Sequence, residues 1–521
     1  MEALFSVAGD ALAPANVAWV LFGVTLGYLV GALPGLGKGT ATAVAIPLTF
    51  YLAPLSAIAF LVGISKGSTA GSAVSAILLN TPGEPSSAPT AMAGYPLARA
   101  GQAQKALKMG LFASVIGDLF STIVLILVAQ ELAAFALGIG PVELTAILVF
   151  SLVFIAGLSG RSLTKGLIAG LFGILASCVG LEVETGSPRL TFGLIELYDG
   201  LPLIPVAIGM LALSEMMIQI GQRQRLEQEA DLLAGSSKHE DNVVTLDDWR
   251  RCIRPIVRGS LIGTVIGILP GLGASVGSFL SYGAERKASG RGTDFEESGA
   301  IEGVAAAESA DNAVVPASLV PLFAIGIPGS VIAAILIGAF TIQGITPGPL
   351  LFIENKDLIL GVYVSMLAAS LILLFIGYFG QNMFARIVRV SPALVMPVVV
   401  FLCCIGSYLQ GGGVFGIGVM IVFGIIGFFS KKYDFSFVTF LIGFVVGPSF
   451  ELSLRQSLGL VKSFDELMNH PVALVFGVLA IVGIWRLTVL QRRQMEEMAA
   501  HEAAAQPKGD VLASTREKAT S

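Results

Sequence analysis

The chain has 521 residues, of which 55% are hydrophobic and only 13% charged, whereas charged residues make up about 25% of a typical soluble domain. The composition, with a mean hydropathy of +0.83, argues against a water-soluble globular protein and indicates a polytopic membrane protein. The net charge of −5 comes without a long basic block, so nucleic acid is not expected as a partner. The four cysteines and three histidines show no metal-ligand spacing, which argues against a disulfide framework and a zinc site.

Apolar runs that could span or re-enter the lipid bilayer recur along the whole chain. The first begins without a basic segment or a cleavage site, so we expect it to be retained as a span. Together the runs predict an all-α polytopic membrane protein with about twelve spans and some broken or re-entrant helices. They lie at 17–33, 40–64, 70–80, 106–137, 141–158, 166–181, 200–220, 257–284, 300–326, 328–346, 358–380, 393–410, 412–429, 435–449 and 472–490.

One long polar segment, residues 221–256, divides these runs into two membrane regions, 1–220 and 257–490. The basic residues of this segment lie at its two membrane edges, which by the positive-inside rule predicts that the segment is cytoplasmic. The last residues, 491–521, are polar and Ala-rich and predict a frayed helix followed by disorder, on the cytoplasmic side.

The two membrane regions contain an internal repeat. Residues 23–37, GVTLGYLVGALPGLG, match residues 259–273, GSLIGTVIGILPGLG, at 8 of 15 positions. A second match pairs LLNTPG at 78–83 with AIGIPG at 324–329. If the first region starts outside and the second inside, the two enter the membrane from opposite sides. We therefore predict two inverted-topology repeats whose broken helices meet near the midplane.

The LPGLG and Pro-Gly breaks supply the candidate substrate site. Proline and glycine do not continue a regular helix, and the N–H groups freed at a helix N-terminus favour an anion. The alternatives are packing kinks, a capped interfacial loop at 79–87, and lysines that snorkel to the interface. The candidate substrate-binding residues are Gly35, Gly37, Lys38, Lys66, Asn80, Thr81, Pro82, Gly83, Gly271, Gly273, Gly326, Pro328, Gly329 and Ser330.

Ionisable residues interrupt one of the later apolar runs. Glu308, Asp311 and Asn312 lie at i, i+3 and i+4, so one helix face could hold two carboxylates and an amide. Such a group could bind Na⁺ or share a proton, and we predict that it couples the protein to a cation gradient. A solvent-filled mouth or a helix cap is the alternative. Asp118 and Glu215, which also lie in spans, are expected to pair between helices.

No cofactor or further metal is expected, and the sequence lacks the signatures of common enzymes. GLGKGT at 35–40 departs from both the Walker pattern and GxGxxG, and HExxH is missing. We therefore expect a protein that is not an enzyme.

Six motifs, in order, resemble the large membrane subunit (TctA type) of the tripartite tricarboxylate transporters, and the resemblance extends from residue 17 to about 490. The motifs are GALPGLG at 31–37, AILLNTPGEP at 76–85, GYPLARAGQAQKAL at 94–107, GAIEGVAAAESADNA at 299–313, GIPGS at 326–330 with GITPGPLLF at 344–352, and GPSFELSLRQSL at 447–458.

The resemblance implies a bacterial inner-membrane permease that imports tricarboxylates, dicarboxylates or aromatic acids. It also implies a periplasmic solute-binding protein and a small four-helix membrane subunit as partners, a Na⁺ or H⁺ gradient as the driving force, and the option of a homodimer. This chain departs from the family pattern at Lys38, Lys66 and 307–312, which alters the charge at the expected site. A stand-alone carboxylate carrier, a passive anion channel, a membrane-embedded enzyme and a scaffold subunit are the alternatives.

Overall fold

The structure, a computed structural model, describes residues 2–33, 35–158, 162–182, 185–221, 241–292, 294–387 and 392–505. These residues are almost entirely helical; within the described ranges the strands form one antiparallel hairpin, β1 (Gly180–Leu181) with β2 (Pro188–Arg189). The same ranges contain seven helices long and apolar enough to cross a membrane and five shorter apolar helices. The predicted class, an all-α polytopic membrane protein, is confirmed.

The first membrane region also contains short 3-10 turns and two π-helical turns, which interrupt its α-helices. The α-helices are α1 (Glu2–Ala11), α2 (Pro14–Ala32), α3 (Lys38–Ala45), α4 (Pro54–Leu79), α5 (Ala88–Leu97), α6 (Ala103–Ala136), α7 (Pro141–Leu158), α8 (Leu163–Ser177), α9 (Leu203–Ile208) and α10 (Ser214–Gly221). The 3-10 turns are Ile46–Tyr51, Pro85–Ser87 and Ile195–Leu197, and the π-helical turns are Ala98–Gln102 and Gly209–Leu213.

The second membrane region repeats the alternation of long and short helices. Its helices are α11 (Leu246–Ile268), α12 (Gly273–Ser289), α13 (Asp294–Glu297), α14 (Ile301–Ala317), α15 (Leu319–Ile325), α16 (Val331–Ile342), α17 (Leu351–Glu354), α18 (Lys356–Ile387), α19 (Pro392–Gln410), α20 (Val414–Lys432), α21 (Phe437–Leu460), α22 (Phe464–Leu467) and α23 (Pro471–Ala505).

The structure defines two of the predicted boundaries more closely. The polar segment predicted at 221–256 is helical from Leu246 onwards, because Thr245 and Asp248 form a capping box that starts α11 there. In the tail predicted from residue 491 as a frayed helix followed by disorder, α23 continues well beyond its apolar part, as far as Ala505. The rest of both predictions falls on 222–240 and 506–521, outside the described residues.

The glycines of the repeat lie where helices pack most closely. A Cβ built on Gly27 of α2 would lie 2.2 Å from the carbonyl oxygen of Ile64 in α4, and one on Gly263 of α11 would lie 2.3 Å from the carbonyl oxygen of Ala310 in α14. The equivalent helix pairs of the two halves therefore meet backbone to backbone, as small residues allow in membrane proteins.

Replacing Gly27 with Leu is expected to prevent this packing. The side chain would meet the backbone of α4, which cannot move aside as a flexible side chain can, so the cost should be at the upper end of the about 1–3 kcal/mol typical of overpacking, or above it. Gly418→Leu is the matched control, because a Cβ on Gly418 of α20 meets nothing within 4 Å. Thermal unfolding of the purified variants checks this, and equal stability of the two would contradict it.

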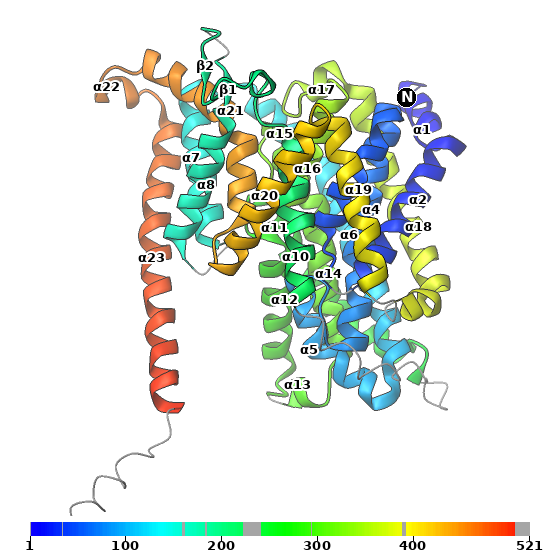
Figure 1. Ribbon diagram of the computed structural model, residues 1–521. Coiled ribbons are helices and arrows are strands. Elements are labelled where there is room, and N and C mark those ends of the chain that lie inside the picture. Colours follow the sequence, from blue (N-terminus) through cyan, green and yellow to red (C-terminus); the bar gives the residue numbers. More distant parts are fainter. Residues whose placement is uncertain are drawn as a thin grey trace, which may run out of the picture.

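The two halves run through the molecule in opposite directions. α2 packs along α4 and α11 along α14, and each pair also contacts the other half, α4 with α18 and α14 with α6. In Figure 1 α1 lies at the top and α13 at the bottom. α2 follows α1 and therefore starts at the top. α12 descends to α13, so α11, which packs against α12 and precedes it in the chain, starts at the bottom. This arrangement agrees with the predicted inverted repeat.

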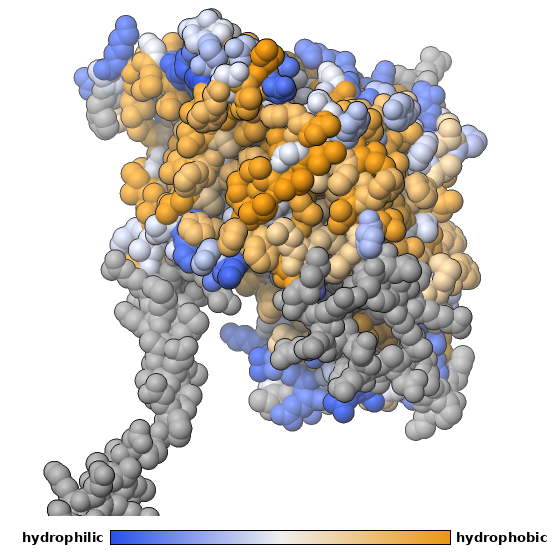
Figure 2. Space-filling view, in the orientation of Figure 1, coloured by the Kyte–Doolittle hydropathy of each residue, from blue (hydrophilic) through white to orange (hydrophobic). Residues whose placement is uncertain are grey.

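A second group of helices, α7, α8, α21 and α23, packs beside this central bundle and stands at the left of Figure 1. Figure 2 shows a broad hydrophobic band across the middle of the molecule, with hydrophilic residues gathered above and below it. Large apolar side chains such as Phe375, Phe401 and Trp485 are exposed. An apolar belt between two polar ends is the surface that a lipid bilayer requires.

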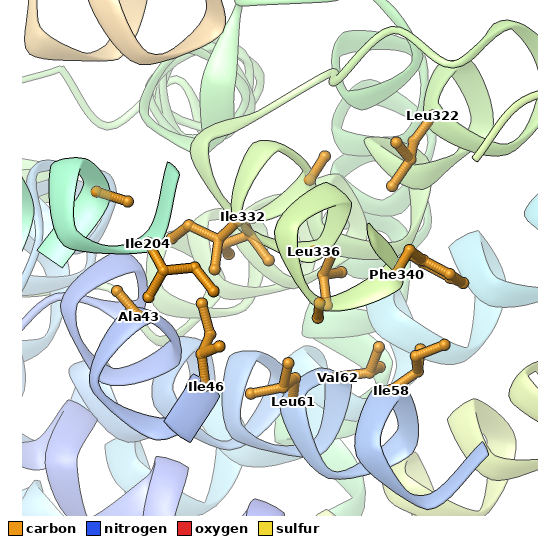
Figure 3. Packing of buried hydrophobic residues seen from close by; sticks show 14 of the residues in the cluster. Ala43, Ile46, Ile58, Leu61, Val62, Ile204, Leu322, Ile332, Leu336 and Phe340 are labelled. Atoms are coloured by element: carbon orange, nitrogen blue, oxygen red, sulfur yellow. The ribbon is translucent and has the colours of Figure 1, made fainter. Parts of the chain in front are cut away.

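The hydrophobic core joins the short helices of both halves. Figure 3 shows Ala43 of α3 and Leu61 of α4 packed near Ile204 of α9 and near Ile332 and Leu336 of α16. The segments that follow the predicted breaks are thus fixed against one another by buried apolar contacts. At the centre of the molecule, every residue of α14 is buried.

Candidate functional site

The two LPGLG breaks are present, and each is held by a hydrogen bond to a distant segment. Gly35 has a φ of 79° and Gly271 a φ of 85°, a region that favours glycine. The carbonyl oxygen of Gly35 accepts a hydrogen bond of 2.7 Å from Nε2 of Gln219. The N–H of Gly271 donates to the carbonyl oxygen of Gly329 at 3.1 Å. In the second half, the LPGLG and Pro-Gly breaks are therefore joined directly.

The two Pro-Gly breaks follow helices that end in the same way. α4 ends at Leu79 with Asn80 in the left-handed conformation (φ 51°), and α15 ends at Ile325 with Gly326 in that conformation (φ 74°). The chain then restarts as a helix; in the second half Ser330 caps α16 by accepting a hydrogen bond of 3.2 Å from the N–H of Ala333. The predicted interruptions are therefore real ends of helices.

The helices that restart after the breaks meet across the two halves. α3, after the first LPGLG, contacts α16, after the second Pro-Gly; α12, after the second LPGLG, contacts the 3-10 turn Pro85–Ser87, after the first Pro-Gly. A Cβ on Gly39 would lie 3.4 Å from Val331. The structure thus brings together most of the predicted substrate-binding residues: Gly35, Gly37, Lys38, Asn80, Thr81, Pro82 and Gly83 in one half, and Gly271, Gly273, Gly326, Pro328, Gly329 and Ser330 in the other.

Lys38, the first residue of α3, forms two ion pairs, and the one with Asp311 connects the two halves. Its Nζ lies 3.1 Å from Oε2 of Glu84 and 3.1 Å from Oδ1 of Asp311. Its backbone N–H donates to Oε1 of the same Glu84. The Glu84 carboxylate therefore occupies the N-terminus of α3, which is a preferred position for an anion.

Glu308 lies one turn before Asp311 on α14 and is completely buried. Thr90 Oγ1 donates to its Oε1 at 2.6 Å, and Ser114 Oγ donates to its Oε2 at 2.9 Å. The Nδ2 of Asn312 donates to Ser114 Oγ at 2.9 Å and lies 3.4 Å from Glu308 Oε2. The predicted face of two carboxylates and an amide thus exists, and it is enclosed by α5 and α6.

The cluster contains more acidic than basic side chains. It contains three carboxylates, those of Glu84, Glu308 and Asp311, and one ammonium, that of Lys38. Oδ2 of Asp311 is buried and has no hydrogen-bond partner among the described residues. Because an unbalanced buried charge is costly, such a cluster favours the uptake of a cation or a proton. Among the described residues, no group of three or more His, Cys, Asp or Glu side chains is arranged to hold a metal ion.

Replacing Lys38 with Gln is expected to destabilise the protein by about 3–5 kcal/mol, because it leaves the buried Asp311 without its cation. Adding Asp311→Asn in the same chain removes the unpaired charge and is expected to recover much of the lost stability. Thermal unfolding of the single and double variants measures both effects. A double variant less stable than Lys38→Gln would contradict this ion-pair assignment.

Lys66 is the one predicted substrate-binding residue that the structure places elsewhere. It lies 14 residues before Asn80 on α4, which is about 21 Å along the helix. Its Nζ forms an ion pair of 2.8 Å with Oδ2 of Asp118. Asp118 is thus paired between helices as predicted, and so is Glu215, whose Oε2 lies 2.7 Å from Nζ of Lys431.

Three residues of the cluster were missed by the sequence analysis. Glu84 directly follows the Pro-Gly break, and an acidic residue at the start of a restarting segment was a usable signal. Thr90 and Ser114 carried no signal, because they are ordinary hydroxyl residues whose contact with Glu308 depends on how α5, α6 and α14 pack.

A separate cavity of about 670 Å³ lies beside the β hairpin and α21. Its polar side is an ion-pair network in which Arg189 lies 2.6 Å from Glu451, and Arg455 pairs with both Glu451 and Glu182. Glu451 and Arg455 belong to the motif GPSFELSLRQSL at 447–458. The network joins the 180–201 segment to α21 at the end of the molecule that is uppermost in Figure 1.

The fold and the paired breaks define a polytopic membrane transport protein built from two inverted halves. The family model of the tripartite tricarboxylate transporter TctA family matches residues 17–442. An uncharacterized 52.8 kDa protein in the TAR-I ttuC' 3'region of Agrobacterium vitis is 35% identical over 465 residues, which cover 89% of this chain and 91% of that protein. The chain belongs to the TctA family.

A second protein of the same organism, an uncharacterized protein in the TAR-II ttuC' 3'region, is 35% identical over 212 residues, which cover 40% of this chain and 87% of that protein. No solved structure matches the chain. The family places the chain among membrane components of transporters, which is the class that the sequence motifs implied.

Proposed function

We propose that this chain is the large permease subunit of a secondary transporter that imports carboxylates and is driven by a Na⁺ or H⁺ gradient. The observation that carries the proposal is the buried cluster at the junction of the two halves, in which Lys38 holds Glu84 and Asp311 beside Glu308. Membership of a family of tripartite tricarboxylate transporters supports the substrate class and the existence of partners.

The substrate carboxylate takes the place that the Glu84 carboxylate holds in this structure. Glu84 accepts the N–H of Lys38 and pairs with its ammonium, so this position offers the two interactions that an anionic ligand needs at a helix N-terminus. When a substrate carboxylate displaces Glu84, Lys38 remains paired with Asp311 and keeps the two halves connected. The neutral donors at Thr81 and Ser330 border the same junction.

The coupling ion binds beside Glu308 and Asp311. Substrate adds further negative charge to a cluster that already has more carboxylates than ammonium groups, so binding of the anion favours simultaneous binding of Na⁺ or H⁺. Reciprocal stabilisation of two ligands is the thermodynamic requirement for symport. A passive anion channel has no need for this excess of negative charge, which would repel its permeant ion.

The partners are a periplasmic solute-binding protein and a small four-helix membrane subunit, and the site of action is the bacterial inner membrane. The end of the molecule where α12 and α13 lie carries Arg286 and Lys287 in the last turn of α12. By the positive-inside rule this end faces the cytoplasm, the side that the sequence predicts for the 221–256 loop and the C-terminus. The opposite end, with the β hairpin, then receives the binding protein. The exposed apolar surface of the second group of helices, α7, α8, α21 and α23, is compatible with a homodimer.

The substrate class is tested by uptake into cells that express this chain with its small partner, with and without a binding protein. The labelled panel contains citrate, a succinate-type dicarboxylate and an aromatic carboxylate. We expect accumulation of at least one class only when the binding protein is present. Uptake that ignores the binding protein would favour the stand-alone carrier, and transport of none of the acids would contradict the proposed substrate class.

A further inference from the structure

The ammonium group of Lys66 lies inside a cage of oxygen atoms from two other helices, α6 and α18. Its Nζ is 2.8 Å from Oδ2 of Asp118, 3.2 Å from Oγ1 of Thr122, 2.9 Å from the carbonyl oxygen of Met366 and 2.9 Å from Oγ of Ser370. Lys66 is on α4, Asp118 and Thr122 are on α6, and the other two are on α18. All five residues are at most 1% exposed.

This cage has more oxygen atoms than an ammonium group can donate hydrogen bonds to. An ammonium donates three hydrogen bonds, whereas four oxygens surround Nζ. The hydroxyl of Ser370 also contacts Oδ2 of Asp118 and the carbonyl oxygen of Met366, so its proton has acceptors and its lone pairs can face Nζ. A spherical cation has no such directional limit and could use all four oxygens together.

The chemistry of the four ligands is that of a site for a hard cation. Carboxylate, hydroxyl and backbone carbonyl oxygens are the groups that such ions take in proteins. The single carboxylate matches one positive charge, so a monovalent ion would leave the cage neutral. The second oxygen of Asp118, Oδ1, is buried without a hydrogen-bond partner among the described residues and is available as a further ligand.

The position of Lys66 excludes the alternative that its side chain reaches the membrane interface. It lies 12 residues from the start of α4 and 13 from its end, which is about 18–20 Å from either end of the helix. Its neighbour Gly67 packs against the backbone of α2, where a Cβ would lie 2.2 Å from the carbonyl oxygen of Val24. The side chain of Lys66 thus ends in the cage, far from both ends of the helix.

We propose that these four oxygens form a monovalent-cation site whose resident occupant is the tethered ammonium of Lys66. The site binds free Na⁺, K⁺ or NH₄⁺ when that side chain is shortened. For transport, an inference that rests on the proposed function, the occupant of this cage is covalently tethered and does not exchange with ions in solution. The exchangeable coupling ion then binds elsewhere, at Glu308 and Asp311.

The test is thermal unfolding of purified Lys66→Ala in choline, Li⁺, Na⁺, K⁺ and NH₄⁺ chlorides at constant ionic strength. We expect at least one of the small cations to raise the melting temperature of Lys66→Ala by more than it does in the unmodified protein, in a saturable manner. Adding Ser370→Ala is expected to raise the half-saturating cation concentration about tenfold, because one ligand is lost. Adding Asp118→Asn is expected to abolish the effect.

Lys66→Met/Asp118→Asn is the control for folding, because it removes both charges and should be stable in every salt. A Lys66→Ala protein with the same salt dependence as the unmodified protein would overturn the proposal. So would a Lys66→Ala protein that fails to fold in all five salts while this control folds. Because the readout is cation binding, a failure here is distinct from a failure of carboxylate transport.

Discussion

Replacing Glu308 with Gln is expected to separate substrate movement from the ion gradient. Thr90 and Ser114 donate to different oxygens of Glu308. Gln keeps the size of the side chain and one of these two acceptors, but it can neither release a proton nor supply charge to a cation. Coupling between two ligands is typically worth about 5–150-fold in affinity, so we expect gradient-driven accumulation to fall about tenfold or more. Exchange of labelled for unlabelled substrate needs no net ion movement and should fall much less.

The measurement is accumulation and exchange by the same vesicle preparation, with Glu215→Gln as the matched control. Glu215 is also a carboxylate paired between helices, but its partner is Lys431 and it lies outside the cluster. An unchanged ion dependence in Glu308→Gln would remove Glu308 from the coupling role. An equal loss of exchange and accumulation would place it in substrate binding instead.

Replacing Gly329 with Leu is expected to abolish uptake while the protein still reaches the membrane. A Cβ on Gly329 would lie 2.6 Å from the carbonyl oxygen of Ser318, and the N–H of Gly271 bonds to the carbonyl oxygen of Gly329 itself. A bulky side chain would therefore displace the second Pro-Gly break from the junction. Gly83→Leu is expected to act in the same way in the first half, where a Cβ would lie 3.1 Å from the carbonyl oxygen of Gly31.

Gly477→Leu is the control for the two glycine variants, because a Cβ at Gly477 of α23 meets nothing within 4 Å. The amount of each variant in the membrane and its initial rate of uptake are measured together. We expect the control to transport normally and both break variants to lose uptake at comparable membrane levels. Normal transport by Gly329→Leu and Gly83→Leu would contradict the assignment of the site to the paired breaks.

The sequence predicts the features that depend on short stretches of chain. Glycines at four-residue steps predict where helices pack closely, and LPGLG and Pro-Gly predict where helices end, because backbone freedom and the missing proline N–H act locally. The spacing of Glu308 and Asn312 likewise predicts a shared helix face. These local rules are sufficient to predict the helical membrane class and the places where the two halves are interrupted.

Features that depend on packing between distant segments were not predictable in the same way. Thr90 and Ser114 are far from Glu308 in sequence, and their hydroxyls become part of the cluster only because α5, α6 and α14 converge. Lys66 is predicted to bind substrate because it precedes the first Pro-Gly break in the chain, but 14 residues of helix separate it from Asn80. Its actual partners come from α6 and α18, which no local pattern indicates.

The most direct test is uptake into sealed proteoliposomes that contain this chain and its small partner, supplied with the binding protein and a labelled carboxylate. An imposed inward Na⁺ or H⁺ gradient is present in one set and dissipated by an ionophore in the other. We predict accumulation above the external concentration in the first set and only equilibration in the second. Equal internal and external concentrations in both sets would contradict gradient-driven transport and indicate a passive anion channel.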